Sequence, residues 1–349
     1  TAIARRMIRA ELGQPVEALF TSFSDPLAAA SIAQVHHASR ADDGAEVAVK
    51  VLRPGIEAAF RRDIDAFHLA ASLIERLSPA SRRLRPRDVV AHFESVVMGE
   101  LDLRLEAASA SLFADNVRKD AGFTVPHPHW PLSSRRVMTS DWVHGTPMSD
   151  VDAIRAAGHD TGALASRMIQ LFLSHALRDG FFHADMHQGN LRVGPKGDIV
   201  AFDFGIMGEI DEYTRRTYAE IILGFIQRDY HRVARVHFEA GYVPRDQNMA
   251  EFARALRAVG EPIFGADASR ISMANLLSYL FEVTERFGMQ TRTELILLQR
   301  TMVVVEGVAR SLDPQINMWE AARPVVQDYV RDNLGPRAAI RDGLKVVQA

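Results

Sequence analysis

The sequence predicts an α+β fold with two lobes, a small N-terminal lobe that contains β-strands and a larger C-terminal lobe that is mostly helical. Strand–turn–strand patterns occur at residues 31–52 and 190–203, and most of the remaining chain has the 3.6-residue apolar period of helices. With 349 residues, the chain is long enough to bury two substantial cores. We therefore place the N-terminal lobe at residues 1–143 and the C-terminal lobe at residues 144–349.

The N-terminal lobe is expected to begin with a helix and a β-hairpin. The helix runs to about Leu12, where Gly13 supplies a stop signal. Residues 22–30 are then predicted to form a loop rich in alanine. Two segments rich in β-branched and apolar residues follow, and Asp43-Gly44 between them is a strong hairpin signal. The Ala-rich loop therefore lies at the entrance of a hairpin.

Helices are expected to form most of the remaining chain. Helical periodicity covers residues 56–77 and about 88–119, and short β-segments broken by prolines follow up to a hinge near 139–145. The C-terminal lobe is predicted to contain a helical stretch at 150–179, the second hairpin, and helices from about residue 211 onward.

Composition excludes several classes of function. A net charge of −3 gives no reason to expect binding to nucleic acid. The chain has no cysteine, which excludes disulfides, thiolate metal sites and cysteine nucleophiles and fits a reducing, cytoplasmic location. Residues 1–9 lack the apolar core of a signal peptide, and the most apolar stretch, residues 295–309, is interrupted by charges. Since the chain starts without Met, we expect it to be part of a longer protein.

Three motifs in order along the chain indicate phosphoryl transfer. Lys50 ends a Val-Ala-Val-Lys strand, Asp185 and Asn190 have Asp-x-x-x-x-Asn spacing, and Asp203 begins Asp-Phe-Gly after an apolar strand. In such a loop the aspartate orients or deprotonates the acceptor, while the asparagine and the later aspartate are oxygen ligands suited to Mg²⁺ between phosphates. We therefore predict Asp185, Asn190 and Asp203 as catalytic residues, with Asn190 and Asp203 holding the metal.

Each of these residues has a simpler interpretation. Lys50 alone would be a solvated strand residue, and Asp203 alone a turn residue before Gly205. His183 and His187, four residues apart, would suit zinc if they were on a helix, but Gly189 and the following strand indicate a loop, and no third ligand is near in sequence. The joint order of the three motifs favours phosphoryl transfer, with His183 as a residue that braces the loop and His187 without a role.

Six blocks of sequence resemble the UbiB family, the ADCK-type atypical kinase-like proteins linked to ubiquinone biosynthesis. The resemblance runs from about residue 11 to 325 and implies a protein-kinase-like two-lobed fold. The blocks are "DPLAAASIAQVHHA" (25–38), "VAVKVLRPGI" (47–56), "ELDLRLEAASA" (100–110), "FFHADMHQGNL" (181–191), "AFDFG" (201–205) and "VEGVARSLDP" (305–314).

The resemblance implies a set of nucleotide-binding residues. In the family an Ala-rich loop replaces the Gly-rich phosphate loop, and because alanine adds a Cβ atom it restricts the loop and should hold ATP or ADP differently. Lys50 would contact the phosphates with Glu106 as its ion-pair partner, and Glu100 and Asp102 match an E-x-D element. The implied nucleotide-binding residues are Ala28, Ala29, Ala30, Ser31, Val35, Lys50, Glu106, Asp141 and Val143.

The chain departs from the family pattern in two places. The K-x-G-Q motif that normally meets the E-x-D element is absent, because "ELGQ" (11–14) has glutamate where lysine belongs; we expect that motif, like the C-terminal membrane helices of many members, to lie outside this stretch. In the catalytic loop, Met186 and Gln188 replace the family's prolines, which bears on the geometry of the loop but not on the Asp/Asn pair.

The function expected from these features is that of a Mg²⁺-dependent nucleotide-binding atypical kinase or ATPase that supports ubiquinone or other isoprenoid-lipid metabolism. Its expected partners are a nucleotide and, for the full-length protein, an isoprenoid or quinone-like lipid and a membrane surface. The alternatives are a small-molecule kinase of the aminoglycoside-phosphotransferase type and a nucleotide-gated lipid-binding module without catalysis.

About eight residues separate Gly205 from the helix near Tyr213, too few for a peptide-docking segment, so we predict no ordinary protein phosphorylation.

Overall fold

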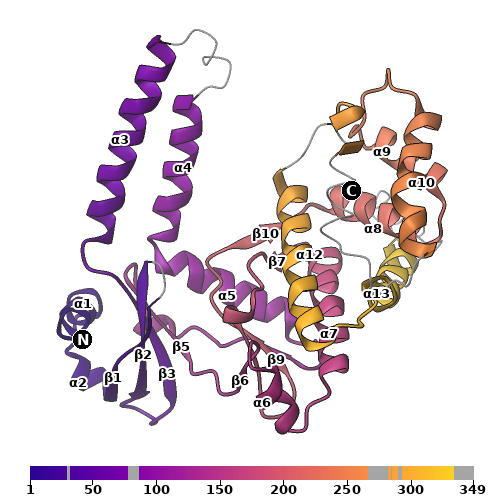
Figure 1. Ribbon diagram of the computed structural model, residues 1–349. Coiled ribbons are helices and arrows are strands. Elements are labelled where there is room, and N and C mark those ends of the chain that lie inside the picture. The colour runs from indigo at the N-terminus through magenta and orange to yellow at the C-terminus, as the bar shows by residue number, and fades with distance from the viewer. Residues whose placement is uncertain (30–31, 78–85, 266–281, 284, 290–292, 334–349) are drawn as a thin grey trace, which may run out of the picture. The chain divides into compact units, whose positions relative to one another are not determined.

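The computed structural model describes residues 1–29, 32–77, 86–265, 282–283, 285–289 and 293–333 (Figure 1). Its residues form two compact units, each held together by its own contacts. Unit 1 comprises residues 1–115, 125–144 and 202–205, and unit 2 comprises residues 116–124, 145–201 and 206–349. The mixed architecture, with a β-sheet in unit 1 and mostly helices in unit 2, confirms the α+β prediction.

Unit 1 is built around an antiparallel four-stranded sheet of order β1-β2-β3-β5. Unit 1 also contains helix α1. Gly13 ends this helix with a left-handed φ of 73°, which confirms the predicted stop signal. The elements are α1 (Ala2–Leu12), α2 (Val16–Leu19), β1 (Phe20–Ala29), β2 (Ala33–Arg40), β3 (Glu46–Leu52), α3 (Ile56–Leu77), α4 (Pro86–Glu100), α5 (Leu103–Val117), a 3₁₀ turn (Trp130–Leu132) and β5 (Val137–Asp141).

The core of unit 1 fixes the direction of Lys50. Val47, Val49 and Val51 of β3 are buried together with Ala4 and Ile8 of α1. Because side chains alternate along a strand, Lys50 projects from the opposite face of the sheet. The apolar alternation of one strand thus places the lysine away from the core.

Two predictions for this unit were wrong in detail. Residues 22–29, expected in a loop, belong to strand β1; it is an edge strand, where Pro26 is tolerated, and its register with β2 shifts at three places. The single helix expected at 88–119 is divided into α4 and α5. The break falls at Leu101, which is fully buried, and Asp102, whose carboxylate accepts a hydrogen bond from the backbone N–H of Arg104 at the start of α5.

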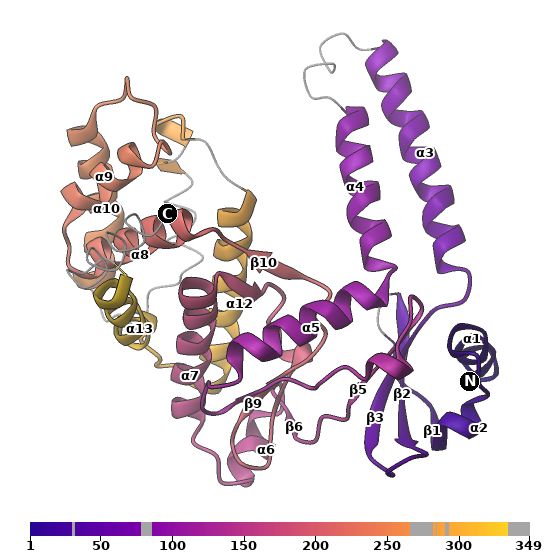
Figure 2. The ribbon, with the colours of Figure 1, turned by 180° about the vertical axis from the view of Figure 1, so that it is seen from behind.

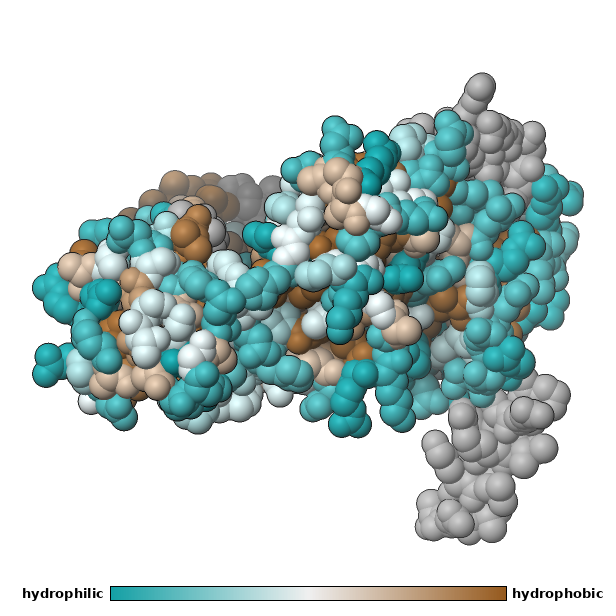
Figure 3. Space-filling view, turned by 90° about the horizontal axis from the view of Figure 1, so that it is seen from below, coloured by the Kyte–Doolittle hydropathy of each residue, from teal (hydrophilic) through white to brown (hydrophobic). Residues whose placement is uncertain are grey.

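Large apolar side chains are exposed on the α3–α4 helix pair, which Figure 2 shows as two long antiparallel helices. Phe67 and Phe93 form an edge-to-face pair, and Leu69 and Leu77 are more than half exposed. Elsewhere hydrophilic residues separate small apolar areas on the face drawn in Figure 3. None of the helices within the described ranges is both long and apolar enough to cross a bilayer.

Unit 2 packs helices α12 and α13 against α7, whose buried face includes Leu164, Met168 and Phe172. The second hairpin is confirmed as β8–β9, within a sheet of order β4-β9-β8-β6. The elements are β4 (Phe123–Thr124), β6 (Thr146–Pro147), α6 (Val151–Ala156), α7 (Thr161–Ser174), a π-helical turn (His175–Asp179), β7 (Phe181–His183), a 3₁₀ turn (Gln188–Asn190), β8 (Leu191–Val193), β9 (Ile199–Ala201), β10 (Met207–Glu209), α8 (Glu212–Ile226), α9 (Tyr230–Glu239), α10 (Met249–Gly265), α12 (Thr293–Leu312) and α13 (Met318–Asn333).

A buried histidine should make unit 2 sensitive to acid. The ring of His237 on α9 packs edge-on against Tyr242 and Phe252, and its Nδ1–H donates to the carbonyl oxygen of Val233. Burial lowers the pKa of His237 to about 4, against about 6.5 in an unfolded chain. Between pH 6.5 and pH 4 the unfolded state binds more protons at this histidine than the native state does. The free energy of unfolding therefore falls as the pH falls through this range, by about 3 kcal/mol in total.

Equilibrium urea unfolding at pH 7 and pH 4.5 tests this. We expect His237→Phe to reduce the loss of unfolding free energy between the two pH values. His231→Phe, on an exposed position of the same helix, should leave the wild-type loss in place. An equal loss in wild type and His237→Phe would contradict the assignment.

Candidate functional site

Lys50, Glu106 and Asp203 form a cluster of charges in unit 1. The Nζ atom of Lys50 lies 2.7 and 2.8 Å from the two carboxylate oxygens of Glu106 and 3.2 Å from Oδ1 of Asp203. The side chains of Lys50 and Glu106 are 14% and 9% exposed, whereas that of Asp203 is 38% exposed. Burial opposes the ammonium charge, but the carboxylates of Glu106 and Asp203 outweigh it and raise the pKa of Lys50. Burial in turn raises the pKa of Glu106, against the opposing effect of the lysine.

The backbone around Asp203 explains how its carboxylate reaches the lysine. Asp203 has a positive φ of 66°, a conformation that aspartate tolerates better than most side chains. Phe204 is buried and its ring packs against that of Phe113 on α5, at 5.6 Å between centroids. The buried phenylalanine anchors the segment, and the strained residue before it turns its carboxylate toward Lys50.

The sheet aligns further predicted residues with Lys50. Ala28 of β1 pairs with Val35 of β2, and Val35 pairs with Lys50 of β3, so three predicted residues lie in one row across the strands. Ala30 and Ser31 lie outside the described residues. Val143 follows β5 and is partly buried.

The E-x-D element separates into two different environments. Partial burial and then the negative charge of Asp203 raise the pKa of Glu100, at the end of α4, whereas the positive charge of Lys50 lowers it. Asp102 instead forms a two-point ion pair with Arg104, at 2.9 and 2.6 Å, and this hydrogen bonding lowers the pKa of Asp102. Glu100 is therefore electrostatically linked to the cluster, while Asp102 starts helix α5.

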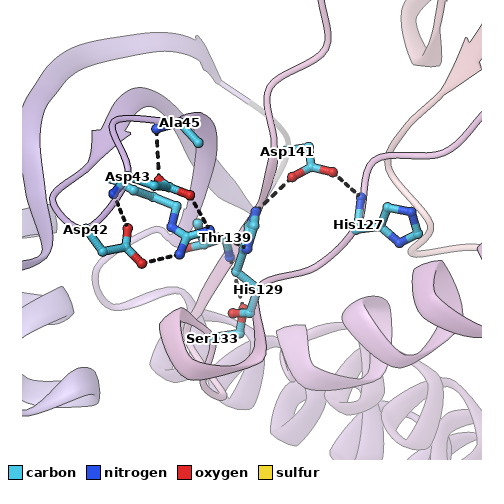
Figure 4. A network of polar contacts seen from close by, with 9 residues as sticks. Asp42, Asp43, Ala45, His127, His129, Ser133, Thr139 and Asp141 are labelled. Atoms are coloured by element: carbon cyan, nitrogen blue, oxygen red, sulfur yellow. Dashed lines mark hydrogen bonds and ion pairs between the residues drawn. The ribbon is translucent and has the colours of Figure 1, made fainter.

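The predicted hinge residue Asp141 is held by protein donors (Figure 4). Its Oδ2 accepts the backbone N–H of His127 at 3.0 Å, and its Oδ1 lies 2.8 Å from Nε2 of His129. The other ring nitrogen of His129 lies 3.4 Å from Arg40, which also pairs with Asp42 in the β2–β3 turn. The carboxylate thus braces the end of β5.

In unit 2 the structure brings Asp185 and Asn190 together. The Nδ2 atom of Asn190 donates to the backbone carbonyl of Asp185 at 3.0 Å and lies 3.3 Å from its Oδ2. The Nδ1 atom of His183 accepts the backbone N–H of Asp185 at 3.1 Å, which confirms that His183 braces the loop. Since the amide nitrogen of Asn190 faces Asp185, its side-chain oxygen takes no part in these two contacts.

His187 has a local role that the sequence did not suggest. Its Nδ1 accepts the backbone N–H of Gly189 at 3.0 Å and so caps the 3₁₀ turn that carries Asn190, while its Nε2 lies 3.5 Å from Oδ2 of Asp185. The hydrogen bond at Nδ1 places the ring proton on Nε2, facing the carboxylate. Within the described ranges no group of three His, Cys, Asp or Glu side chains could hold a metal. The Asp-x-His spacing was the only available signal for this contact.

A helix distant in sequence also contacts the loop. Thr301 and Ser311 of α12 hydrogen-bond to Ala184 and Gln188, on either side of Asp185. No local sequence pattern connects these residues to the loop, because more than a hundred positions separate each pair.

A lysine–glutamate pair beside an Asp-Phe-Gly aspartate, and an Asp-x-x-x-x-Asn loop, define a protein of the kinase-like class. The comparisons with known proteins agree. The ABC1 atypical kinase-like domain matches residues 1–237, and the UbiB helical domain matches residues 256–317. The chain therefore belongs to the UbiB family of atypical kinase-like proteins.

Similar proteins extend beyond this chain. Those named "Probable protein kinase UbiB" from Marinobacter nauticus and Xanthomonas axonopodis pv. citri are 39% and 40% identical over 343 and 352 residues; both alignments cover 97% of this chain, but only 62% and 63% of the relatives. A solved structure described as the Rv3197–erythromycin complex from Mycobacterium tuberculosis superposes with a TM-score of 0.69 at 25% identity, covering 97% of this chain and 83% of that one.

Proposed function

We propose that this chain is the nucleotide-binding part of a Mg²⁺-dependent atypical kinase or ATPase that serves ubiquinone or other isoprenoid-lipid metabolism. The observation that carries the proposal is the buried Lys50–Glu106 pair with Asp203 beside it. A lysine kept charged at the edge of a buried site provides a cation for nucleotide phosphates, and the partner carboxylate fixes its position. The exposed side chain of Asp203 and the carbonyl oxygen of Asn190 are suitable ligands for Mg²⁺.

The proposed roles follow the environment of each residue. Lys50 binds the phosphates of ATP or ADP, and the row through Ala28 and Val35 lies beside it on the sheet. Mg²⁺, when bound, neutralises phosphate charge. Asp185 orients or deprotonates the group that attacks the terminal phosphate, and Asn190 and His187 keep its carboxylate in place.

The segment after Asp-Phe-Gly supports a small acceptor over a protein. Six residues, 206–211, separate Gly205 from α8, and three of them form strand β10, which pairs antiparallel with β7. The backbone of β10 is paired with β7, so this segment is not a long loop on which a substrate peptide could dock. The exposed apolar side chains on α3 and α4 support a lipid or membrane partner for the full-length protein.

Metal-dependent nucleotide binding is the first test. We expect ATP and ADP to raise the melting temperature in the presence of Mg²⁺ and to have little effect in EDTA, since a ligand at 100 times its dissociation constant stabilises the native state by about 2.7 kcal/mol. Asp203→Asn should weaken this response, and Asp152→Asn, whose side chain is 97% exposed, should preserve it. An equal shift with and without Mg²⁺ would contradict the proposed metal dependence.

The acceptor separates this proposal from its alternatives. Phosphate release without an added acceptor supports an ATPase, whereas a strict requirement for a hydroxyl-bearing small molecule supports a kinase of the aminoglycoside-phosphotransferase type. Nucleotide binding without turnover supports the lipid-binding module. Robust phosphorylation of an added protein above the Asp203→Ala background would overturn the small-acceptor proposal.

A further inference from the structure

Helix α12 contacts the catalytic loop immediately before Asp185. The hydroxyl of Thr301 is fully buried and lies 3.1 Å from the carbonyl oxygen of Ala184 and 2.8 Å from that of Leu297, one turn earlier in its own helix. Its single hydrogen is thus placed between a carbonyl of α12 and a carbonyl of the loop. Ala184 is the residue next to Asp185, so this contact fixes the backbone that carries the carboxylate.

A second contact lies on the other side of Asp185. The side-chain amide of Gln188 donates to the hydroxyl oxygen of Ser311 at 2.6 Å, and that hydroxyl donates in turn to the carbonyl oxygen of Val308 at 2.7 Å. The N–H of Gln188 that faces Ser311 and the O–H of Ser311 each have an acceptor, so the two bonds form a hydrogen-bond relay from the loop into α12.

The two contacts lie ten residues apart on one helix, from 301 to 311, which corresponds to about 15 Å along its axis. Two attachment points on a rigid element restrict both the position and the tilt of the segment between them. Hydrogen bonds inside the loop, such as that from the N–H of Asn190 to the carbonyl of His187, fix its local shape. They do not fix its orientation within unit 2.

We infer that α12 is a positioning element for the catalytic loop and that Thr301, Ser311 and Gln188 are positioning residues for Asp185. The inference rests on the proposed role of Asp185 in phosphoryl transfer. Residues 301 and 311 both fall in the stretch that matches the UbiB helical domain, outside the kinase-like match at 1–237. The helical part of the chain thereby sets the geometry of the proposed catalytic carboxylate, so a displacement of α12 changes the rate of turnover more than the affinity for nucleotide.

Steady-state kinetics of phosphate release test this with matched variants. Thr301→Val and Ser311→Ala should each lower kcat about tenfold with KM for ATP changed less than about twofold, because misplacing a catalytic group by a fraction of an ångström slows the reaction. Thr301→Ser keeps the hydroxyl group and should have a kcat close to that of wild type. The control is Thr217→Val on α8, a buried threonine that also bonds the carbonyl four residues earlier, that of Tyr213. Gln188→Ala and Ser311→Ala should have non-additive effects when combined.

Hydrogen exchange provides a readout that does not depend on turnover. The amides of Asp185, His187, Gly189 and Asn190 are all hydrogen-bonded within the loop. In Thr301→Val and Ser311→Ala the peptide that contains them should exchange faster than in wild type and in Thr217→Val, while peptides from α9 remain unchanged.

The two measurements distinguish the inference from the function on which it rests. Unchanged kcat together with unchanged loop exchange would overturn it, as would a kcat loss that merely follows the fraction of unfolded protein. If wild type neither releases phosphate nor transfers it to an added hydroxyl-bearing small molecule, the proposed function fails. In that case faster loop exchange in both variants still supports the attachment by α12, and unchanged exchange refutes it.

Discussion

Replacing Lys50 by methionine is expected to lower the free energy of unfolding by about 3–5 kcal/mol and to abolish nucleotide binding. The ammonium group neutralises Glu106, whose side chain is 9% exposed, and lies close to Asp203. Without the lysine, a buried carboxylate must either remain charged without its partner or take up a proton, and both cost stability. Urea unfolding at pH 7 and thermal shift with Mg²⁺-ATP measure the two effects separately.

A second substitution separates the structural effect from the functional one. The double variant Lys50→Met with Glu106→Leu should recover most of the lost stability, because replacing both members of a buried ion pair by apolar residues is often neutral. It should not recover nucleotide binding. The control is Lys119→Met, at an exposed position of unit 2. A single Lys50→Met variant that is as stable as wild type, or that binds nucleotide normally, would contradict the assignment.

Asp185→Asn is expected to reduce phosphate release by about 10²–10⁴-fold, while nucleotide binding and stability remain close to wild type. The substituted amide cannot accept a proton from the attacking group. The backbone carbonyl of Asp185, which Asn190 contacts at 3.0 Å, is unaffected, so the loop should retain its shape. A single-turnover measurement of phosphate release, combined with nucleotide titration by thermal shift, gives both quantities.

The control for this variant is Asp160→Asn. Asp160 caps α7 by accepting the N–H of Ala163, and asparagine caps a helix about as well as aspartate, so its phosphate release should match wild type. Unchanged phosphate release in Asp185→Asn would show that the carboxylate takes no part in the chemistry. His187, which lies beside it, would then be the next candidate for the catalytic base.

Much of the fold follows from local sequence. The β-branched and apolar residues at 46–52 predicted strand β3, and Asp43-Gly44 predicted the hairpin. The side of the sheet on which Lys50 lies follows only from the burial of Val47, Val49 and Val51 in the structure. Strand β1 was missed because its proline and irregular register hide the period of two. The break at Leu101 was missed because apolar residues continue through it at helical spacing, and only the cap by Asp102 reveals it.

The contacts of the candidate site are harder to predict from local sequence than the strands and helices are. Spacing alone identified Asp185 and Asn190, and the family resemblance supplied Glu106 as the partner of Lys50. The contacts of Thr301 and Ser311 depend on how α12 packs in three dimensions, and nothing near either residue in the sequence marks them as neighbours of the loop. The cap formed by His187 depends on a ring orientation that only the folded loop determines.

The packing of α12 and α13 on α7 bears on the autonomy of the kinase-like region. That region's sequence match ends at residue 237, yet α7, inside it, has seven buried side chains and contacts both later helices. A chain cut after residue 237 would expose this apolar face to water and leave the carbonyl of Ala184 without its threonine donor. The boundary of sequence similarity is therefore not a boundary of independent folding, and the helical segment after it belongs to the same cooperative structure as the catalytic loop.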